Sequence, residues 1–214
     1  MWEMIVNMSE NEAVQIIETL NSNEFIAEYF NKKEEVIKKT LELIPEKASI
    51  GIAGSITIRS LGIKEMLINR GCKIFDIWED GLSKKEVLDV RRAQLTCDVL
   101  LCSTNAITLN GELVNIDNSG NRVAAMTFGP QKVIVIAGIN KIVRDIKAAV
   151  NRTKNVAAPK ITNYLGYKTL CSSSGYCHNC KPPETMCRVT SIIGVKPRAA
   201  GDYYIFLVGE ELGF

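Results

Sequence analysis

The stretch from Asp98 to Lys141, DVLLCSTNAITLNGELVNIDNSGNRVAAMTFGPQKVIVIAGINK, decides the expected fold. It begins with the apolar run 99–102 and ends with a second apolar, β-branched run at 133–137. Both runs are short enough to be strands, and both are apolar enough to be buried on two faces. We therefore expect them to be central strands of a parallel sheet.

A polar insert lies between these two expected strands. Two turn clusters, at 110–111 and 118–121, flank the segment 112–116, a pattern typical of a short strand in a hairpin. Ligands of open α/β sheets bind beyond the carboxyl ends of the strands, which favours a site here. Plain turn chemistry is the alternative, because hairpin turns also require Asn, Asp and Gly.

The rest of the chain alternates between strand and helix patterns. Further strands are expected at 25–30, 49–53, 73–76, 189–193 and 203–208, and helices at 10–20, 32–44, 58–69, 84–96 and 142–153. This alternation predicts a single α/β domain over residues 1–214, with a mostly parallel sheet flanked by helices and the hairpin inserted after its middle.

Composition excludes some functions. The chain has 214 residues, 46% of them apolar, and a net charge of +2. Its lysines are scattered along expected helices rather than gathered with aromatic residues, so we expect no nucleic-acid interface. The N-terminal sequence MWEMIVNMSENEAV has acidic residues and no long apolar core, so we expect neither a signal peptide nor a membrane span, and a cytoplasmic location.

Two further parts of the sequence, the turn after the strand 49–53 and Lys141, suggest an anion site. Gly54, Ser55 and Thr57 lie between an expected strand and helix, where backbone N–H groups can bind phosphates or carboxylates. The alternative is that a short βα turn needs a glycine and an N-cap serine anyway. Lys141 is expected at the start of a helix, where a lysine opposes the helix dipole, so a role in holding a substrate anion would explain it.

A cysteine cluster lies near the C-terminus: Cys171, Cys177, Cys180 and Cys187, within the loop 171–187. Four thiolates suit tetrahedral zinc or an iron–sulfur cluster, and the intervening Gly and Pro residues allow the loop to fold back. A reducing compartment disfavours disulfides. The single close pair with wider gaps on both sides favours a [4Fe–4S] cluster over zinc. The other cysteines, at 72, 97 and 102, are expected to be small apolar core residues.

Several motifs resemble the lactate-utilization domain family (LUD, YkgG-type, DUF162): AGSIT at 53–57, TNAIT at 104–108, GELVNID at 111–117, GNRVAAM at 120–126, FGP at 128–130 and GINK at 138–141. The resemblance covers nearly the whole chain. It implies a fold similar to the NagB/RpiA/CoA-transferase superfamily of sugar-phosphate isomerases and CoA transferases. In those related folds the first glycine-rich loop lines the substrate site.

The first functional hypothesis combines this resemblance with the residues. A lactate-utilization-like protein would bind a small anionic hydroxy- or keto-acid, or a related phosphorylated or CoA-linked metabolite. An arginine and a lysine converging on a carboxylate are the expected chemistry of such recognition. In this hypothesis the anion is held by Gly54, Ser55, Thr57 and Lys141. Polar groups of the ligand are oriented by Asn105, Asn121 and Arg122. Proton transfer or nucleophilic attack is assigned to Glu112 or Asp117.

Two other hypotheses remain open from the sequence. The family's association with lactate-oxidising assemblies implies a non-catalytic subunit whose four-cysteine cluster relays electrons to iron–sulfur oxidoreductase partners. A stand-alone isomerase or CoA-transferase-like enzyme with a structural zinc is the third possibility. The sequence does not decide whether the protein is an enzyme.

Overall fold

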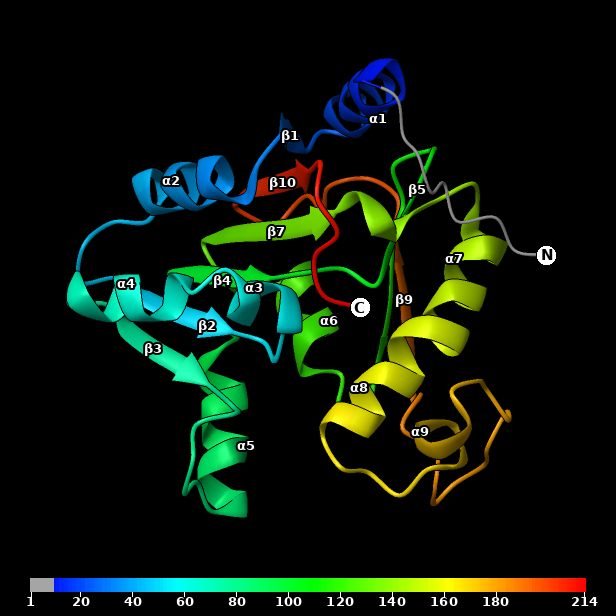
Figure 1. Ribbon diagram of the computed structural model, residues 1–214. Coiled ribbons are helices and arrows are strands. Elements are labelled where there is room, and N and C mark those ends of the chain that lie inside the picture. The colour runs from blue at the N-terminus through cyan, green and yellow to red at the C-terminus, as the bar shows by residue number, and fades with distance from the viewer. Residues whose placement is uncertain (1–9) are drawn as a thin grey trace.

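The computed structural model describes residues 10–214, and a six-stranded parallel sheet forms its centre (Figure 1). The strands follow the order β1 (Ile26–Phe30), β10 (Asp202–Val208), β7 (Lys132–Gly138), β4 (Val99–Cys102), β2 (Ser49–Ile52) and β3 (Lys73–Asp76). Each neighbouring pair is parallel. The predicted parallel sheet is confirmed, and its two predicted central strands, β4 and β7, are the middle pair.

Apolar side chains of β4 alternate between two cores. Leu100 and Cys102 join the core that contains α1 (Glu10–Ser22) and α6 (Asn121–Thr127). Val99 and Leu101 join the opposite core, which contains α2 (Lys33–Leu43), α3 (Ile56–Ser60) and α4 (Ile63–Asn69). Burial on both faces explains why this strand reads as a continuous apolar run rather than an alternating one.

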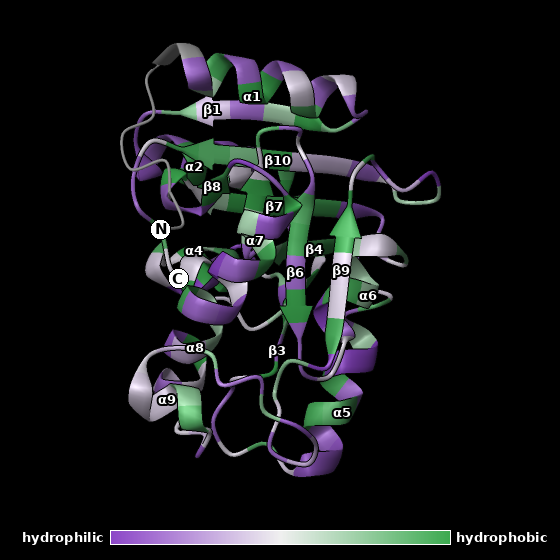
Figure 2. Ribbon diagram, turned by 90° about the vertical axis from the view of Figure 1, so that its right-hand side faces the viewer, coloured by the Kyte–Doolittle hydropathy of each residue, from purple (hydrophilic) through white to green (hydrophobic). Residues whose placement is uncertain are grey.

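A second, four-stranded sheet was not predicted. Its order is β8 (Ile142–Val143), β5 (Ala106–Thr108), β6 (Leu113–Asp117) and β9 (Val189–Ile193). β5 and β6 are antiparallel and form the predicted hairpin. Figure 2 shows β6 and β9 side by side, running across the direction of β1 and β10. The hairpin is therefore half of a small sheet completed by strands from distant parts of the chain.

Two predicted helices were wrong in their boundaries. The helix expected at 58–69 begins earlier, at Ile56, and is divided into α3 and α4 at Gly62, whose φ of +64° lies in the left-handed region that glycine adopts without strain. The helix expected from Ile142 begins later, because Ile142 and Val143 pair with β5 as β8. Helix α7 (Ile146–Arg152) starts after the N-cap Asp145.

This second correction changes the position of Lys141. The residue lies in the short 3-10 turn η1 (Ile139–Lys141) rather than at the N-terminus of a helix. The argument from the helix dipole therefore does not apply to it. Lys141 lies beyond the carboxyl end of β7.

The remaining helices lie near the ends of the strands. Helix α7 continues through the π turn η2 (Thr153–Ala157) into α8 (Ala158–Tyr164), and α9 (Leu170–Ser174) follows. Figure 1 shows α7 and α8 beyond the arrowheads of the parallel strands. Helix α5 (Lys84–Ala93) begins with a capping box, in which Ser83 Oγ accepts from Glu86 N and the Glu86 carboxylate accepts from Ser83 N.

The expectation about membranes was tested over part of the chain. Across residues 10–214, no helix combines the length and the apolar character that crossing a bilayer would require. The N-terminal stretch used for the location hypothesis includes residues 1–9, which lie outside the described residues.

Candidate functional site

A cavity of about 220 Å³ lies at the carboxyl edge of the parallel sheet. Its walls include the turn 53–57 after β2, the segment 103–105 after β4, the segment 116–122 joining β6 to α6, and Lys141 after β7. The structure thus brings the glycine-serine turn and the polar hairpin together around one space. The volume is below the roughly 300–1,000 Å³ of sites for drug-sized ligands, so the cavity suits a small metabolite.

All but one of the candidate cleft residues line this cavity: Gly54, Ser55, Thr57, Asn105, Asp117, Asn121, Arg122 and Lys141. Glu112 does not. It lies at the turn end of the hairpin, where its carboxylate accepts a hydrogen bond from the Thr108 hydroxyl. Because β6 runs from this turn toward the cavity, Glu112 and Asp117 are at opposite ends of the strand, and the catalytic role considered for Glu112 is not retained.

The glycine-serine turn has a structural explanation of its own. Gly54 has φ +61°, and a Cβ there would lie 3.3 Å from the Trp78 ring. Ser55 is the N-cap of α3, and its hydroxyl accepts from Ile58 N. Helix α3 has only five residues, so it offers little dipole to an anion. For Ser55 the ordinary turn chemistry is what the hydrogen bonds support.

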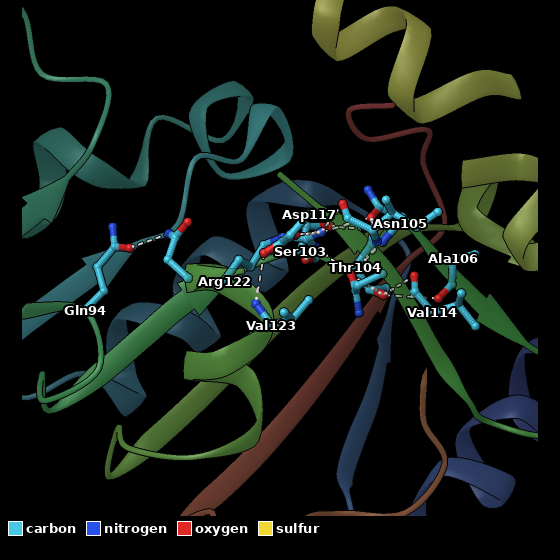
Figure 3. Close-up of polar contacts among 12 residues, drawn as sticks. Gln94, Ser103, Thr104, Asn105, Ala106, Val114, Asp117, Arg122 and Val123 are labelled. Carbon is cyan, nitrogen blue, oxygen red and sulfur yellow. Dashed lines mark hydrogen bonds and ion pairs between the residues drawn. The ribbon is translucent and has the colours of Figure 1, made fainter. Parts of the chain in front are cut away.

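Asp117 and Arg122 form a partly buried ion pair. Arg122 Nη2 lies 2.7 Å from Asp117 Oδ1, and the two side chains are 12% and 8% exposed. The second Asp117 oxygen accepts from Val123 N, near the start of α6. Arg122 also donates to the Ser103 carbonyl and to the amide oxygen of Asn105, as Figure 3 shows for the cluster. The pair joins the hairpin to the ends of β4 and α6, so both charges are already compensated.

The two candidate asparagines at the cavity, Asn105 and Asn121, are held by different neighbours. Asn105 Oδ1 accepts from Ile116 N. The side-chain amide nitrogen of Asn105 has no acceptor among the described residues. Asn121 Nδ2 donates to Gln94 Oε1, and the buried Gln94 amide donates to the carbonyls of Ile52 and Phe75. Gln94 therefore connects α5, β2, β3 and α6 behind the cavity wall.

Lys141 is a buried lysine without a carboxylate partner. Only 3% of the residue is exposed, and Nζ donates to Thr57 Oγ1 and Ser103 Oγ, both at 2.8 Å. Burial lowers the pKa of Lys141 well below its usual value, and the positive charges of Arg152 and Arg122 lower it further. The amine is thus favoured in its uncharged form.

Arg91 is a cavity residue that sequence reasoning missed. It belongs to the last turn of α5, where a basic residue is normally explained by the helix dipole. Its Nε is buried without a hydrogen-bond partner, and no ion pair or hydrogen bond joins its guanidinium to any residue between 10 and 214. An unsatisfied guanidinium at a cavity wall is a ready partner for a carboxylate or phosphate.

One side of the cavity is apolar. Trp78 follows β3, and its ring lies 6.0 Å from that of Tyr164 on α8. Ile161 and Leu165, also from the α8 region, and Phe214 line the same side. The combination of an apolar wall with a few converging polar groups is typical of small-molecule sites.

The four-cysteine loop adjoins this cavity. Cys187 lines it, together with Met186. All four cysteines of the loop are free thiols of intermediate exposure, whereas Cys72, Cys97 and Cys102 are buried in the core as expected. His178 bonds to Ser174 Oγ and stacks on Tyr176 instead of joining the thiols.

The loop was tested against the requirements of a metal site. Within residues 10–214, no three Cys, His, Asp or Glu side chains stand closely enough to hold a metal ion as placed. Desolvation raises the pKa of Cys187 to about 11, and the charges of Cys177, Cys171 and Cys180 raise it too. Cys177 Sγ accepts a hydrogen bond from Asn179 N and donates one to Asn179 Oδ1. The donor chemistry fits a four-thiolate centre.

Comparisons with known proteins agree with this architecture. A family model described as the LUD domain matches residues 13–208. A crystal structure described as a DUF162 family protein from Deinococcus radiodurans superposes with a TM-score of 0.52 at 13% sequence identity, covering 94% of this chain and 99% of the other. At this identity the likeness concerns the fold alone. No curated protein matches the chain.

Proposed function

This chain belongs to the LUD domain family, which is linked to lactate utilization in general, and from that premise we propose that its cavity binds a small organic acid. The ligand class is a hydroxy- or keto-acid of few carbons. Arg91 holds its carboxylate, and the amide groups of Asn105 and Asn121 orient its oxygen substituents.

One observation carries this proposal. The side chains that line the cavity include three basic groups, Arg91, Arg122 and Lys141, and a single carboxylate, Asp117. Asp117 is engaged by Arg122 and by Val123 N, so within residues 10–214 Arg91 has no counter-ion. A cavity with an uncompensated guanidinium attracts an anion, and its low polarity strengthens the resulting ion pair.

The other cavity residues have supporting roles in the proposal. Asp117 and Arg122 keep the hairpin against β4, which positions Asn105. Thr57 and Ser103 hold the amine of Lys141 at the wall. Gly54 packs closely against Trp78, on the β3 side of the cavity.

Binding of lactate, pyruvate and a neutral amide analogue tests the proposal. Trp78 lines the cavity, so its fluorescence should change on binding; Trp2→Phe removes the other tryptophan from the signal. Arg91→Met should weaken acid binding about 10- to 100-fold, the loss expected for a charged hydrogen bond of about 1.5–3 kcal/mol. The neighbouring Arg92 is 68% exposed and paired with Asp89, so Arg92→Met should bind like wild type. Equal affinity for acid and amide would contradict the proposal.

We also propose that Cys171, Cys177, Cys180 and Cys187 hold a metal centre, with a [4Fe–4S] cluster as the first candidate and zinc as the second. The support is that all four thiols are free and that the other three raise the pKa of Cys187. When bound, a cluster would supply one-electron transfer, whereas zinc would stabilise the loop. Most residues between the cysteines are exposed, a position that suits electron exchange with an oxidoreductase partner.

Metal analysis of anaerobically purified protein tests this second proposal. Iron and sulfide with a visible absorption band support the cluster, and stoichiometric zinc without iron removes both the cluster and the electron relay. Cys180→Ser should lower the metal content. Cys72→Ser is the matched control, because Cys72 lies in the core and its thiol donates only to the Pro45 carbonyl. Absence of both metals would contradict the site itself.

A further inference from the structure

We infer that Lys141 is a nucleophile that forms an imine with the carbonyl group of a 2-oxo acid in the cavity. This inference rests on the proposed organic-acid site and names both the ligand class and the reacting atom. The amine belongs to a residue that lines the cavity while its side chain is otherwise enclosed by protein.

The hydrogen bonds around Lys141 define the free position on its nitrogen. Ser103 Oγ donates to the Ile136 carbonyl at 2.6 Å, and Thr57 Oγ1 donates to the Leu212 carbonyl at 3.3 Å. Each hydroxyl donates its own hydrogen to a carbonyl, so toward Lys141 Nζ each hydroxyl oxygen acts as the acceptor. An uncharged amine has two hydrogens and one lone pair. Both hydrogens are therefore used, and the lone pair has no partner in the described chain.

The charged form fits this arrangement less well. An ammonium group would have a third hydrogen with no acceptor, in a place where desolvation of a charge is costly. The groups that act on Lys141 from neighbouring elements are Arg122 on α6, Arg152 on α7 and the thiol of Cys102 on β4, with no carboxylate among them. Burial beside other cations is a recognised way in which proteins activate a lysine nucleophile.

The reaction balances without a further reagent. The Nζ lone pair attacks the carbonyl carbon and forms the C–N bond, giving a carbinolamine. The carbonyl oxygen then leaves with the two hydrogens of the amine as water, and the C=N bond of the imine remains. Arg91 would hold the carboxylate of the acid during this step. Thr57 and Ser103 accept from the amine before the attack and lie beside the departing water.

Reductive trapping with pyruvate tests the inference on the unmodified protein. Wild-type chain incubated at neutral pH with pyruvate and cyanoborohydride should gain one reduced adduct by intact mass, located at Lys141 by peptide mapping. Lys141→Met should lose this adduct. Lys64→Met should retain it, because Lys64 is also partly enclosed but is paired with Asp76 and Glu79. Mapping of the wild-type adduct is decisive even if Lys141→Met folds poorly.

Two further arms separate this inference from the proposed function. Lactate has no carbonyl beside its carboxylate, so it should compete with trapping without forming an adduct. Binding of lactate and pyruvate with no adduct at Lys141 would overturn the nucleophile and leave the acid site standing. Failure of every acid to bind would overturn the proposed function. An adduct spread over exposed lysines would overturn the inference as well.

Discussion

Lys141 was selected as a site residue by a sequence argument that the structure does not support, yet it lies at the cavity. Its selection from sequence depended on an expected helix N-terminus, but the chain forms the 3-10 turn η1 and the strand β8 there. What distinguishes the residue is burial beside two arginines, which no local pattern reveals. Arg91 shows the opposite case. Its place in the last turn of α5 has an ordinary explanation, and only the folded chain exposes its lack of a partner.

The titration of Lys141 predicts a pH-dependent contribution to stability. Its pKa is lowered in the folded chain and near the usual 10.5 in the unfolded chain. Between those two values the unfolded chain binds more protons, so the free energy of unfolding rises with pH. Each unit by which the pKa is lowered corresponds to about 1.4 kcal/mol.

Urea unfolding at increasing pH measures this contribution. The stability of wild type relative to Lys141→Met should increase as the pH rises toward 10.5. Lys64 provides the control: desolvation lowers its pKa, but the hydrogen bonds that it donates to Glu79 and Asp76 outweigh this effect, so its pKa is raised. Wild type relative to Lys64→Met should therefore show no increase over this range. A constant difference between wild type and Lys141→Met would show that the amine is charged in the folded chain.

Among the elements, the short strands were predicted better than the helices near the site. β4 and β7 were predicted correctly because a strand buried on two faces appears in the sequence as an apolar run with turn residues at both ends. The division of α3 from α4 depends on one glycine, and isolated glycines are tolerated in helices often enough to mislead. The second sheet was missed because its outer strands come from distant parts of the chain. Partners in β8 and β5 are 35 residues apart (Ile107 and Ile142), and partners in β9 and β6 are more than 70 apart, so neither pairing has a local signal.

Gln94 links several elements through one amide. It is the C-cap residue of α5, is fully buried, and bonds to β2, the end of β3 and Asn121 of α6. Gln94→Leu should lower the free energy of unfolding by about 2–4 kcal/mol, because two buried carbonyls and an amide lose their partner. Chemical denaturation measures the loss. Gln131→Leu is the control at an exposed position and should change stability little; equal losses in both variants would contradict the assignment.

At the scale of the whole molecule, the sheet core and the cysteine loop differ in the interactions that order them. Both large apolar clusters draw on the six-stranded sheet, and neither includes a residue from 158–192. Helix α9 contributes no buried residue. The sequence predicted both parts, since apolar periodicity indicates the core and cysteine spacing indicates the loop. It did not predict that Cys187 would reach the cavity wall, because that depends on how the second sheet places β9 beside β6.

Hydrogen exchange can test this division. If a metal centre orders the loop, Cys180→Ser should lose protection across residues 170–188 while β4 and β7 remain protected, because their hydrogen bonds lie inside the sheet. Cys72→Ser should leave the loop unchanged. A loss spread over β4 and β7 would indicate that the loop and the sheet form one cooperative unit.

The insertion of β10 between β1 and β7 has a consequence for synthesis on the ribosome. Ile26 aligns with Tyr204 and Lys132 with Asp202, so the first strand must wait for almost the entire chain before it finds its neighbour. At about 5–20 residues per second, that wait lasts roughly ten to forty seconds. Until β10 is made, β1 and then β7 lack their neighbour in the sheet, and unpaired strand edges of this kind are prone to pair with other chains.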